Sequence, residues 1–98
     1  MSIVRHVVVR GRVQGVGFRM WIEDLAERSS LEGWVRNRRD GSVEAVFSGT
    51  EEAVNEAVAA CRQGPRGARV DAVEVEEGGA GLLAQREGGA RFAVLRTT

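Results

Sequence analysis

The chain has 98 residues, which suffice for one modest hydrophobic core but not for two, so we expect a single domain over residues 1–98. Its 14 basic residues, all arginine, balance 14 acidic residues, and the formal net charge of +0 argues against nucleic acid or a membrane surface as a partner. One cysteine and one histidine exclude an internal disulfide and leave no Cys/His cluster that could hold a transition metal.

The first half of the chain predicts a strand, a helix and a hairpin. Apolar residues fall on odd positions between 3 and 13, as in a half-buried strand, with His6 on the other face of that strand. Helical spacing follows from 19 to 31, and Gly33 is expected to end this helix near its C-cap. Two strand-like runs, 34–38 and 42–47, flank an Asp-Gly pair that is typical of an antiparallel hairpin.

The second half predicts a helix and two further strands. Thr50 can N-cap a helix that ends at Gly64-Pro65, and Cys61 falls on the apolar face of that helix as an expected buried spectator. Residues 70–75 and 92–96 read as strands, the second at a sheet edge, and residues 78–90 as a Gly-rich, mobile excursion.

This order of elements predicts an α+β fold, the ferredoxin-like βαββαβ sandwich. Two helices would cover one face of an antiparallel sheet, and a short C-terminal strand would lie at the edge. The first two strands are parallel in that fold, so their C-terminal ends share one edge of the sheet. We therefore expect the Gly-rich loop after the first strand to lie beside Asn37, at the end of the second.

That loop, Gly-Arg-Val-Gln-Gly-Val-Gly-Phe-Arg at 11–19, predicts a phosphate site. Gly15 and Gly17 permit positive φ and a close approach of backbone N–H groups to an anion, and the following helix adds the positive end of its dipole. Arg19 supplies a planar, permanently charged guanidinium. The loop lacks the Gly-Lys-Ser/Thr of a Walker motif and the third glycine of a dinucleotide fingerprint. The alternative is a Gly-rich connection that only turns the chain.

Asn37 has the chemistry to orient a water molecule without acting as a base, because its amide both accepts and donates hydrogen bonds. Without a metal cluster, an acid–base pair or a covalent nucleophile, such a site suits a phosphoryl compound with a good leaving group. A carboxylic–phosphoric anhydride meets that condition and a stable alkyl phosphate does not. The alternative reading of Asn37 is a polar strand-end residue that bonds the Asp-Gly turn.

Three segments of the chain resemble the acylphosphatase family: Val-Gln-Gly-Val-Gly-Phe-Arg at 13–19, Gly-Trp-Val-Arg-Asn at 33–37 and Asp-Gly-Ser-Val-Glu at 40–44. Weaker matches at 64–65, 68–70 and 73 extend the likeness toward the final strand. The resemblance implies hydrolysis of acyl phosphates to carboxylate and inorganic phosphate, without metal or cofactor, on a ferredoxin-like fold.

The resemblance also implies roles for individual residues. The family's catalytic arginine matches Arg19, and its water-orienting asparagine matches Asn37. Its phosphate cradle matches the backbone of Gln14, Gly15, Val16, Gly17 and Phe18. A site of this kind grips the phosphoryl end of the substrate, so it should accept many acyl groups, and the product inorganic phosphate should inhibit.

Two departures from the family pattern concern charge and the chain end. Arg38 and Arg39 add charge beside the site, which would affect substrate capture and its salt dependence. The chain ends in Arg96-Thr97-Thr98 where many relatives finish on an aromatic residue, which would loosen the last strand.

Two other functions share this fold. RNA-recognition domains stack bases on exposed aromatic residues of the central strands, where this chain offers mainly Val, Arg and Ala. Carbamoyl-phosphate-processing maturation proteins carry an acylphosphatase-like domain, but in much longer chains.

No signal-peptide pattern and no membrane-length apolar stretch is present, so we expect a cytoplasmic monomer that binds a small-molecule acyl phosphate, with no nucleic acid or membrane partner.

Overall fold

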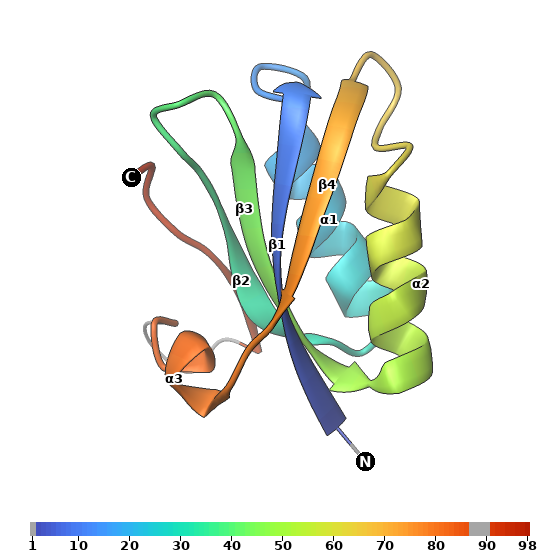
Figure 1. The fold of residues 1–98 in the computed structure, drawn as a ribbon, viewed down its shortest axis with the longest axis vertical. Coiled ribbons are helices and arrows are strands. Elements are labelled where there is room, and N and C mark those ends of the chain that lie inside the picture. The colour runs from blue at the N-terminus through green and yellow to red at the C-terminus, as the bar shows by residue number, and fades with distance from the viewer. Residues whose placement is uncertain (1, 87–90) are drawn as a thin grey trace.

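A computed structural model of the chain describes residues 2–86 and 91–98 and shows a five-stranded sheet in the order β4-β1-β3-β2-β5 (Figure 1). The strands are β1 (Ser2–Arg12), β2 (Glu32–Asn37), β3 (Val43–Thr50), β4 (Arg69–Glu77) and β5 (Phe92–Val94). Strand β1 pairs antiparallel with β3 and β4, and β2 pairs antiparallel with β3. Strand β5 joins the edge parallel to β2. The ferredoxin-like sandwich with a short C-terminal edge strand is therefore confirmed.

Helices α1 (Phe18–Arg28) and α2 (Glu51–Cys61) cover one face of the sheet and enclose the main core (Figure 1). Odd positions of β1, among them Val7 and Val9, are fully buried against them, as the alternating pattern predicts. Thr50 caps α2 by accepting a hydrogen bond from the backbone N–H of Ala53 at 3.1 Å. The inner face of α2 is buried, including Cys61.

The end of α1 differs from the sequence prediction. The helix ends at a C-cap on Ser29, and Ser30 takes φ 56 while Leu31 N–H bonds Ala26 O at 2.9 Å. This is a Schellman arrangement, in which serine occupies the position that glycine usually takes. Gly33 is not a cap but lies inside β2 with φ 142, where a Cβ would overlap the carbonyl oxygen of Val46. Close backbone packing, and not helix termination, requires glycine there.

A short helix, α3 (Ala80–Leu83), lies on the opposite face of the sheet from α1 and α2 (Figure 1). Leu82 and Leu83 pack against a second apolar cluster built on Trp34 and Val46. The indole Nε1 of Trp34 donates to Leu82 O at 2.7 Å. The described part of the predicted Gly-rich excursion is thus packed on the sheet, and residues 87–90 of that excursion lie outside the described residues.

The remaining boundaries shift by a few residues from those predicted. β3 and β4 are longer than expected because they pair with β1 along most of its length, from Ser2 opposite Thr50 to Arg12 opposite Arg69.

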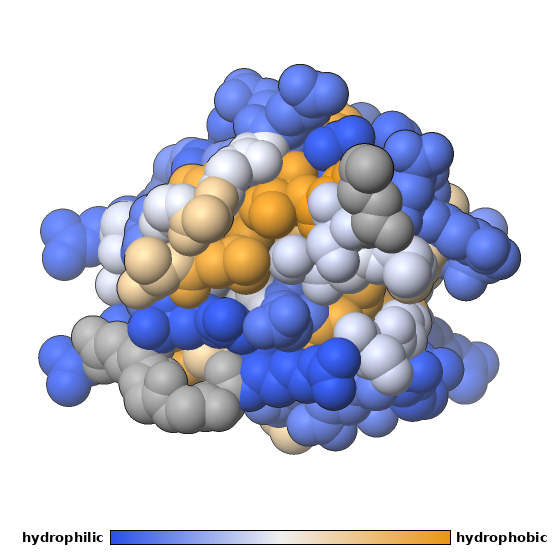
Figure 2. Space-filling model, turned by 90° about the horizontal axis from the view of Figure 1, so that it is seen from below, coloured by the Kyte–Doolittle hydropathy of each residue, from blue (hydrophilic) through white to orange (hydrophobic). Residues whose placement is uncertain are grey.

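Seen from below, the end that carries the start of β1 shows apolar residues gathered in the middle and hydrophilic residues around them (Figure 2). The loop that follows β1 lies at the other end of the molecule (Figure 1). No helix in the described residues is long and apolar enough to cross a membrane.

Candidate functional site

The Gly-rich loop and the end of β2 line one cavity of about 140 Å³. Its walls come from the loop, from the first turn of α1 and from Asn37. The lining residues are Val13, Gln14, Gly15, Gly17, Phe18, Arg19, Met20 and Asn37. The predicted neighbourhood of the loop and Asn37 is therefore confirmed, and it follows from the parallel direction of β1 and β2 on either side of β3.

The loop reaches this shape through two left-handed residues. Gly15 has φ 75 and Gly17 has φ 80, and a Cβ at either position would meet no atom within 4 Å. Both glycines are exposed and line the cavity, so their backbone is accessible from it. Gly17 is also the N-cap of α1, without a side-chain cap and without an acidic residue in the first turn. The helix N-terminus thus offers its positive end at the cavity with no protein carboxylate beside it in that turn.

Arg19 and Asn37 reach the cavity from two different elements. Arg19 is the second residue of α1, half-buried, and its guanidinium carries a fixed positive charge. Asn37 ends β2 on the same face as the fully buried Val35, and this face is the one that packs on α1. The cavity therefore combines a cation, a helix N-terminus and a neutral amide in a space small enough for one phosphoryl group and water.

Comparison with known proteins agrees with this geometry. The family model described as Acylphosphatase matches residues 5–81. A curated acylphosphatase of Rhodopseudomonas palustris strain BisB5 is 56% identical over 96 residues, which cover 98% of this chain and 97% of that relative. The chain belongs to the acylphosphatase family. It is therefore an enzyme that hydrolyses an acyl phosphate, a small-molecule substrate.

Solved acylphosphatases share the fold of this one. The structure from Coxiella burnetii has a TM-score of 0.83 and 34% identity, covering 96% of this chain and 93% of that one. The structure from Bacillus subtilis has a TM-score of 0.81 and 37% identity, covering 97% of this chain and 99% of that one. The loop, the hairpin and the sheet order are thus placed on a scaffold typical of acylphosphatases.

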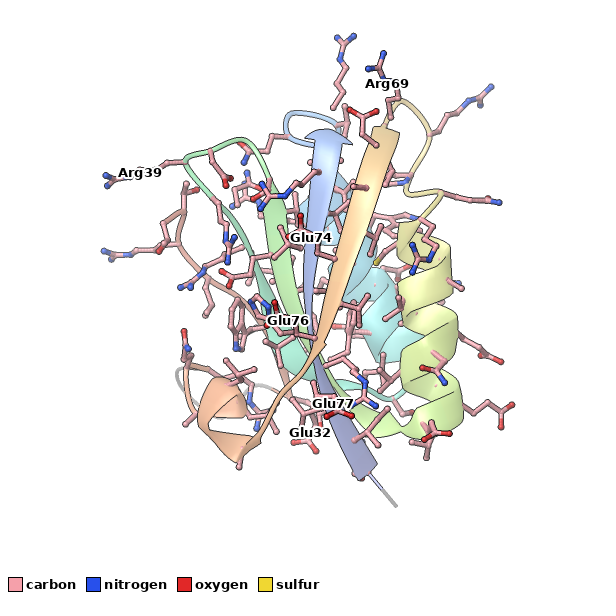
Figure 3. All side chains as sticks on the ribbon, in the orientation of Figure 1. Glu32, Arg39, Arg69, Glu74, Glu76 and Glu77 are labelled. Carbon is pink, nitrogen blue, oxygen red and sulfur yellow. The ribbon has the colours of Figure 1, made fainter. Side chains whose placement is uncertain are left out.

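Arg38 and Arg39, predicted to add charge beside the site, turn away from the cavity of this acylphosphatase. Arg38 Nη2 bonds Glu44 Oε2 at 2.9 Å on the face of the sheet opposite to Asn37. Arg39 extends outward from the tip of the β2–β3 hairpin (Figure 3). Neither residue lines the cavity: the alternation of β2 sends residues 36 and 38 to the face opposite residue 37, and Arg39 lies in the turn beyond the strand.

The other residues that the sequence analysis considered for catalysis, metal binding or base stacking lie away from the acylphosphatase site. His6 Nε2 contacts Glu44 Oε2 at 2.6 Å on the sheet face opposite to α1 and α2. Cys61 is fully buried, and burial raises the pKa of its thiol to about 12, so it is not a nucleophile at neutral pH. Within residues 2–86 and 91–98, no group of three or more His, Cys, Asp or Glu side chains could hold a metal ion. The strand aromatics Trp34, Phe47 and Phe92 are buried and offer no stacking surface for bases.

Two contributors to the acylphosphatase site were missed at the sequence level. The side chain of Gln14, considered there only for its backbone, donates two hydrogen bonds to the β2–β3 hairpin. Met20, which lines the cavity, is 74% exposed although it is a large apolar residue. Its position directly after Arg19, outside the helical apolar stripe, is a signal that could have identified it.

Proposed function

We propose that Arg19 and the backbone amides of residues 14–18 bind the phosphoryl group, and that Asn37 orients the attacking water, without a metal or cofactor. The observation that supports this division is the single small cavity that Arg19, the loop and Asn37 line together. Guanidinium and amide donors would neutralise charge on the phosphoryl oxygens in the transition state. The amide of Asn37 would hold the water on the side opposite to the leaving oxygen.

In the proposed reaction, the water oxygen forms a bond to phosphorus while the bond between phosphorus and the acyl oxygen breaks. The bonding electrons leave with the carboxylate, which is weakly basic and requires no protein acid, and the water protons leave on inorganic phosphate or into solvent. Arginine stays protonated and asparagine has no basic form at neutral pH, so neither side chain is a proton acceptor in this scheme. The protein contributes position and charge.

The product and the substrate share the phosphoryl end, so inorganic phosphate should be a competitive inhibitor. The acyl end lies outside the cradle, and the enzyme should act on several acyl phosphates. We propose that the enzyme acts as a monomer, because Arg19, the loop and Asn37 of a single chain already supply every group that the proposed reaction uses.

The test is hydrolysis of benzoyl phosphate, followed by its ultraviolet absorbance with a chelator present. Arg19→Ala should lower kcat/KM by about a thousandfold and weaken phosphate binding. Asn37→Ala should lose turnover by a similar factor yet bind phosphate nearly as the parent does, because only the water is misplaced. Turnover that the chelator abolishes would contradict a metal-free reaction.

Two control variants test whether the loss of an arginine or an asparagine outside the cavity affects activity. Arg28→Ala removes an exposed arginine from the same helix as Arg19, and Asn55→Ala removes an exposed asparagine from α2. Both should keep the activity of the parent. If Arg19→Ala and Asn37→Ala lost phosphate binding equally, the proposed division of roles would be wrong. A folded parent that binds phosphate without turnover would point to a phosphate-binding module.

A further inference from the structure

The side chain of Gln14 ties the phosphate loop to the hairpin that carries Asn37. Its Nε2 donates to Arg38 O at 2.7 Å and to Ser42 O at 2.8 Å. Both acceptors are backbone carbonyls, which only accept hydrogen bonds, so the amide nitrogen and not the amide oxygen faces them. The two hydrogens of this nitrogen are thus both used, one on the residue that follows β2 and one on the residue that precedes β3.

The two carbonyls belong to the part of the hairpin next to Asn37. Arg38 directly follows Asn37, and its own N–H donates to Ser42 O at 2.9 Å. Asp40 Oδ1 accepts from both the backbone N–H and the hydroxyl of Ser42, at 2.9 and 2.6 Å. These bonds make the turn a braced unit, so a displacement at residues 38 or 42 would be transmitted to Asn37.

Other bonds would keep the hairpin folded without Gln14. Thr98 N–H donates to Asn37 O at 3.1 Å, and Arg39 N–H donates to Thr98 O at 2.7 Å. The β2–β3 ladder continues from Glu32 to Asn37. Among the bonds of the described residues, those of Gln14 join the hairpin directly to the phosphate loop, because both segments lie at the same end of the sheet (Figure 1).

We propose that the Gln14 side chain is a positioning residue, which sets the distance between the phosphate cradle and the water held by Asn37. The proposal rests on the proposed function, since it assumes that Asn37 orients the water. Loss of the two bonds would let the loop and the hairpin separate slightly while each keeps its own structure. A misplacement of about 1 Å in a reacting group lowers rates by up to about a hundredfold.

The experiment compares Gln14→Met, which keeps length without a donor, with Gln14→Lys, whose ammonium can donate to both carbonyls. Gln14→Met should lower kcat for benzoyl phosphate at least about tenfold, while the dissociation constant of inorganic phosphate, measured by calorimetry, changes less than about threefold. Gln14→Lys should recover part of the lost kcat. Gln63→Met removes an exposed glutamine outside the cavity and should match the parent.

A second arm places Gln14→Met in the Asn37→Ala background and measures residual turnover at high enzyme concentration. Because Gln14 acts through Asn37, the added substitution should lower the residual kcat less than about twofold. The proposal is overturned if Gln14→Met leaves kcat unchanged or if phosphate affinity falls as much as kcat. It is also overturned if the fold-losses in kcat from Gln14→Met and Asn37→Ala multiply in the double variant. Full activity of Asn37→Ala alone would instead refute the proposed role of Asn37, so the two failures are distinguishable.

Discussion

Glu44 Oε1 lies 2.6 Å from Nε of Arg36, the residue that faces it across the β2–β3 pair. The other carboxylate oxygen of Glu44 contacts Arg38 at 2.9 Å and His6 at 2.6 Å. The Arg36 guanidinium in turn lies 4.8 Å from the ring centroid of Trp34. One nearly buried carboxylate thus joins three strands on the sheet face that α1 and α2 leave uncovered.

This cluster predicts how stability depends on acid. Burial opposes ionisation of Glu44, but hydrogen bonds from Arg38, His6 and Arg36 outweigh it and lower its pKa from 4.5 to about 2. A carboxyl with a lowered folded-state pKa stabilises the fold above pH 4.5, and this contribution is lost as the pH falls from 4.5 to about 2. The free energy of unfolding of the parent should fall by up to roughly 3 kcal/mol across that window.

Glu44→Gln should remove the contribution of this carboxylate to the acid dependence and be less stable than the parent at pH 7, because the guanidinium groups of Arg36 and Arg38 lose their negatively charged partner. Urea unfolding at several pH values measures both effects. Glu74→Gln is the control, since Glu74 on β4 is exposed and solvent screens its pair with Arg10. If the free energy of unfolding of Glu44→Gln fell between pH 5 and 2 as steeply as that of the parent, the role of this carboxylate would be contradicted.

Gly33→Ala should destabilise the fold strongly. The residue has φ 142, and a Cβ would overlap Val46 O and lie 2.7 Å from the Val46 carbonyl carbon on the neighbouring strand β3. We expect a loss of at least about 3 kcal/mol in the free energy of unfolding. Gly41→Ala in the hairpin turn, with φ 94 and open space around it, should lose only about 1–2 kcal/mol. Equal urea midpoints for the two variants would refute the steric argument.

Local patterns predicted the order of strands and helices along the chain, the fold class, the two long helices and the neighbourhood of the Gly-rich loop and Asn37. Alternation and helical spacing carry this information because each element buries one face in a common core. The true place of Gly33 was not predictable, since its requirement for glycine comes from β3, which is distant in sequence. The bonds of Gln14 were missed for the same reason: they span 24 and 28 residues and depend on the packed loop. Helix α3 spans four residues, too few for periodicity to show.

Met20→Ala should alter selectivity among acyl phosphates. The side chain is 74% exposed and lines the cavity. In the bound substrate, an aromatic acyl group that extends out of the phosphate cradle would therefore cover the apolar surface of Met20. Burial of a few tens of Å² contributes about 1 kcal/mol, which is roughly fivefold in KM. KM for benzoyl phosphate should therefore rise about fivefold, while KM for acetyl phosphate stays within about twofold.

Val75→Ala removes another exposed apolar residue, on β4 and outside the cavity, and should change neither KM value. Equal rises of KM for both substrates in Met20→Ala would show that Met20 shapes the phosphate cradle and does not contact the acyl group.

Trp34→Phe should loosen α3 while leaving the main core intact. The indole N–H donates to Leu82 O at 2.7 Å, and phenylalanine keeps the apolar contact but removes this bond, so that Leu82 O keeps only the bond from Gln85 N–H at 3.3 Å. A lost hydrogen bond of this kind destabilises by about 1 kcal/mol, and the loss should fall on local opening of α3 because few other contacts hold it. Amide hydrogen exchange of Ala84, whose N–H bonds Ala80 O at 3.2 Å, should become about fivefold faster, with exchange in α2 unchanged. Trp21→Phe is the matched control in α1, so equal acceleration at Ala84 in both variants would mean that global unfolding, and not the Trp34 bond, governs α3.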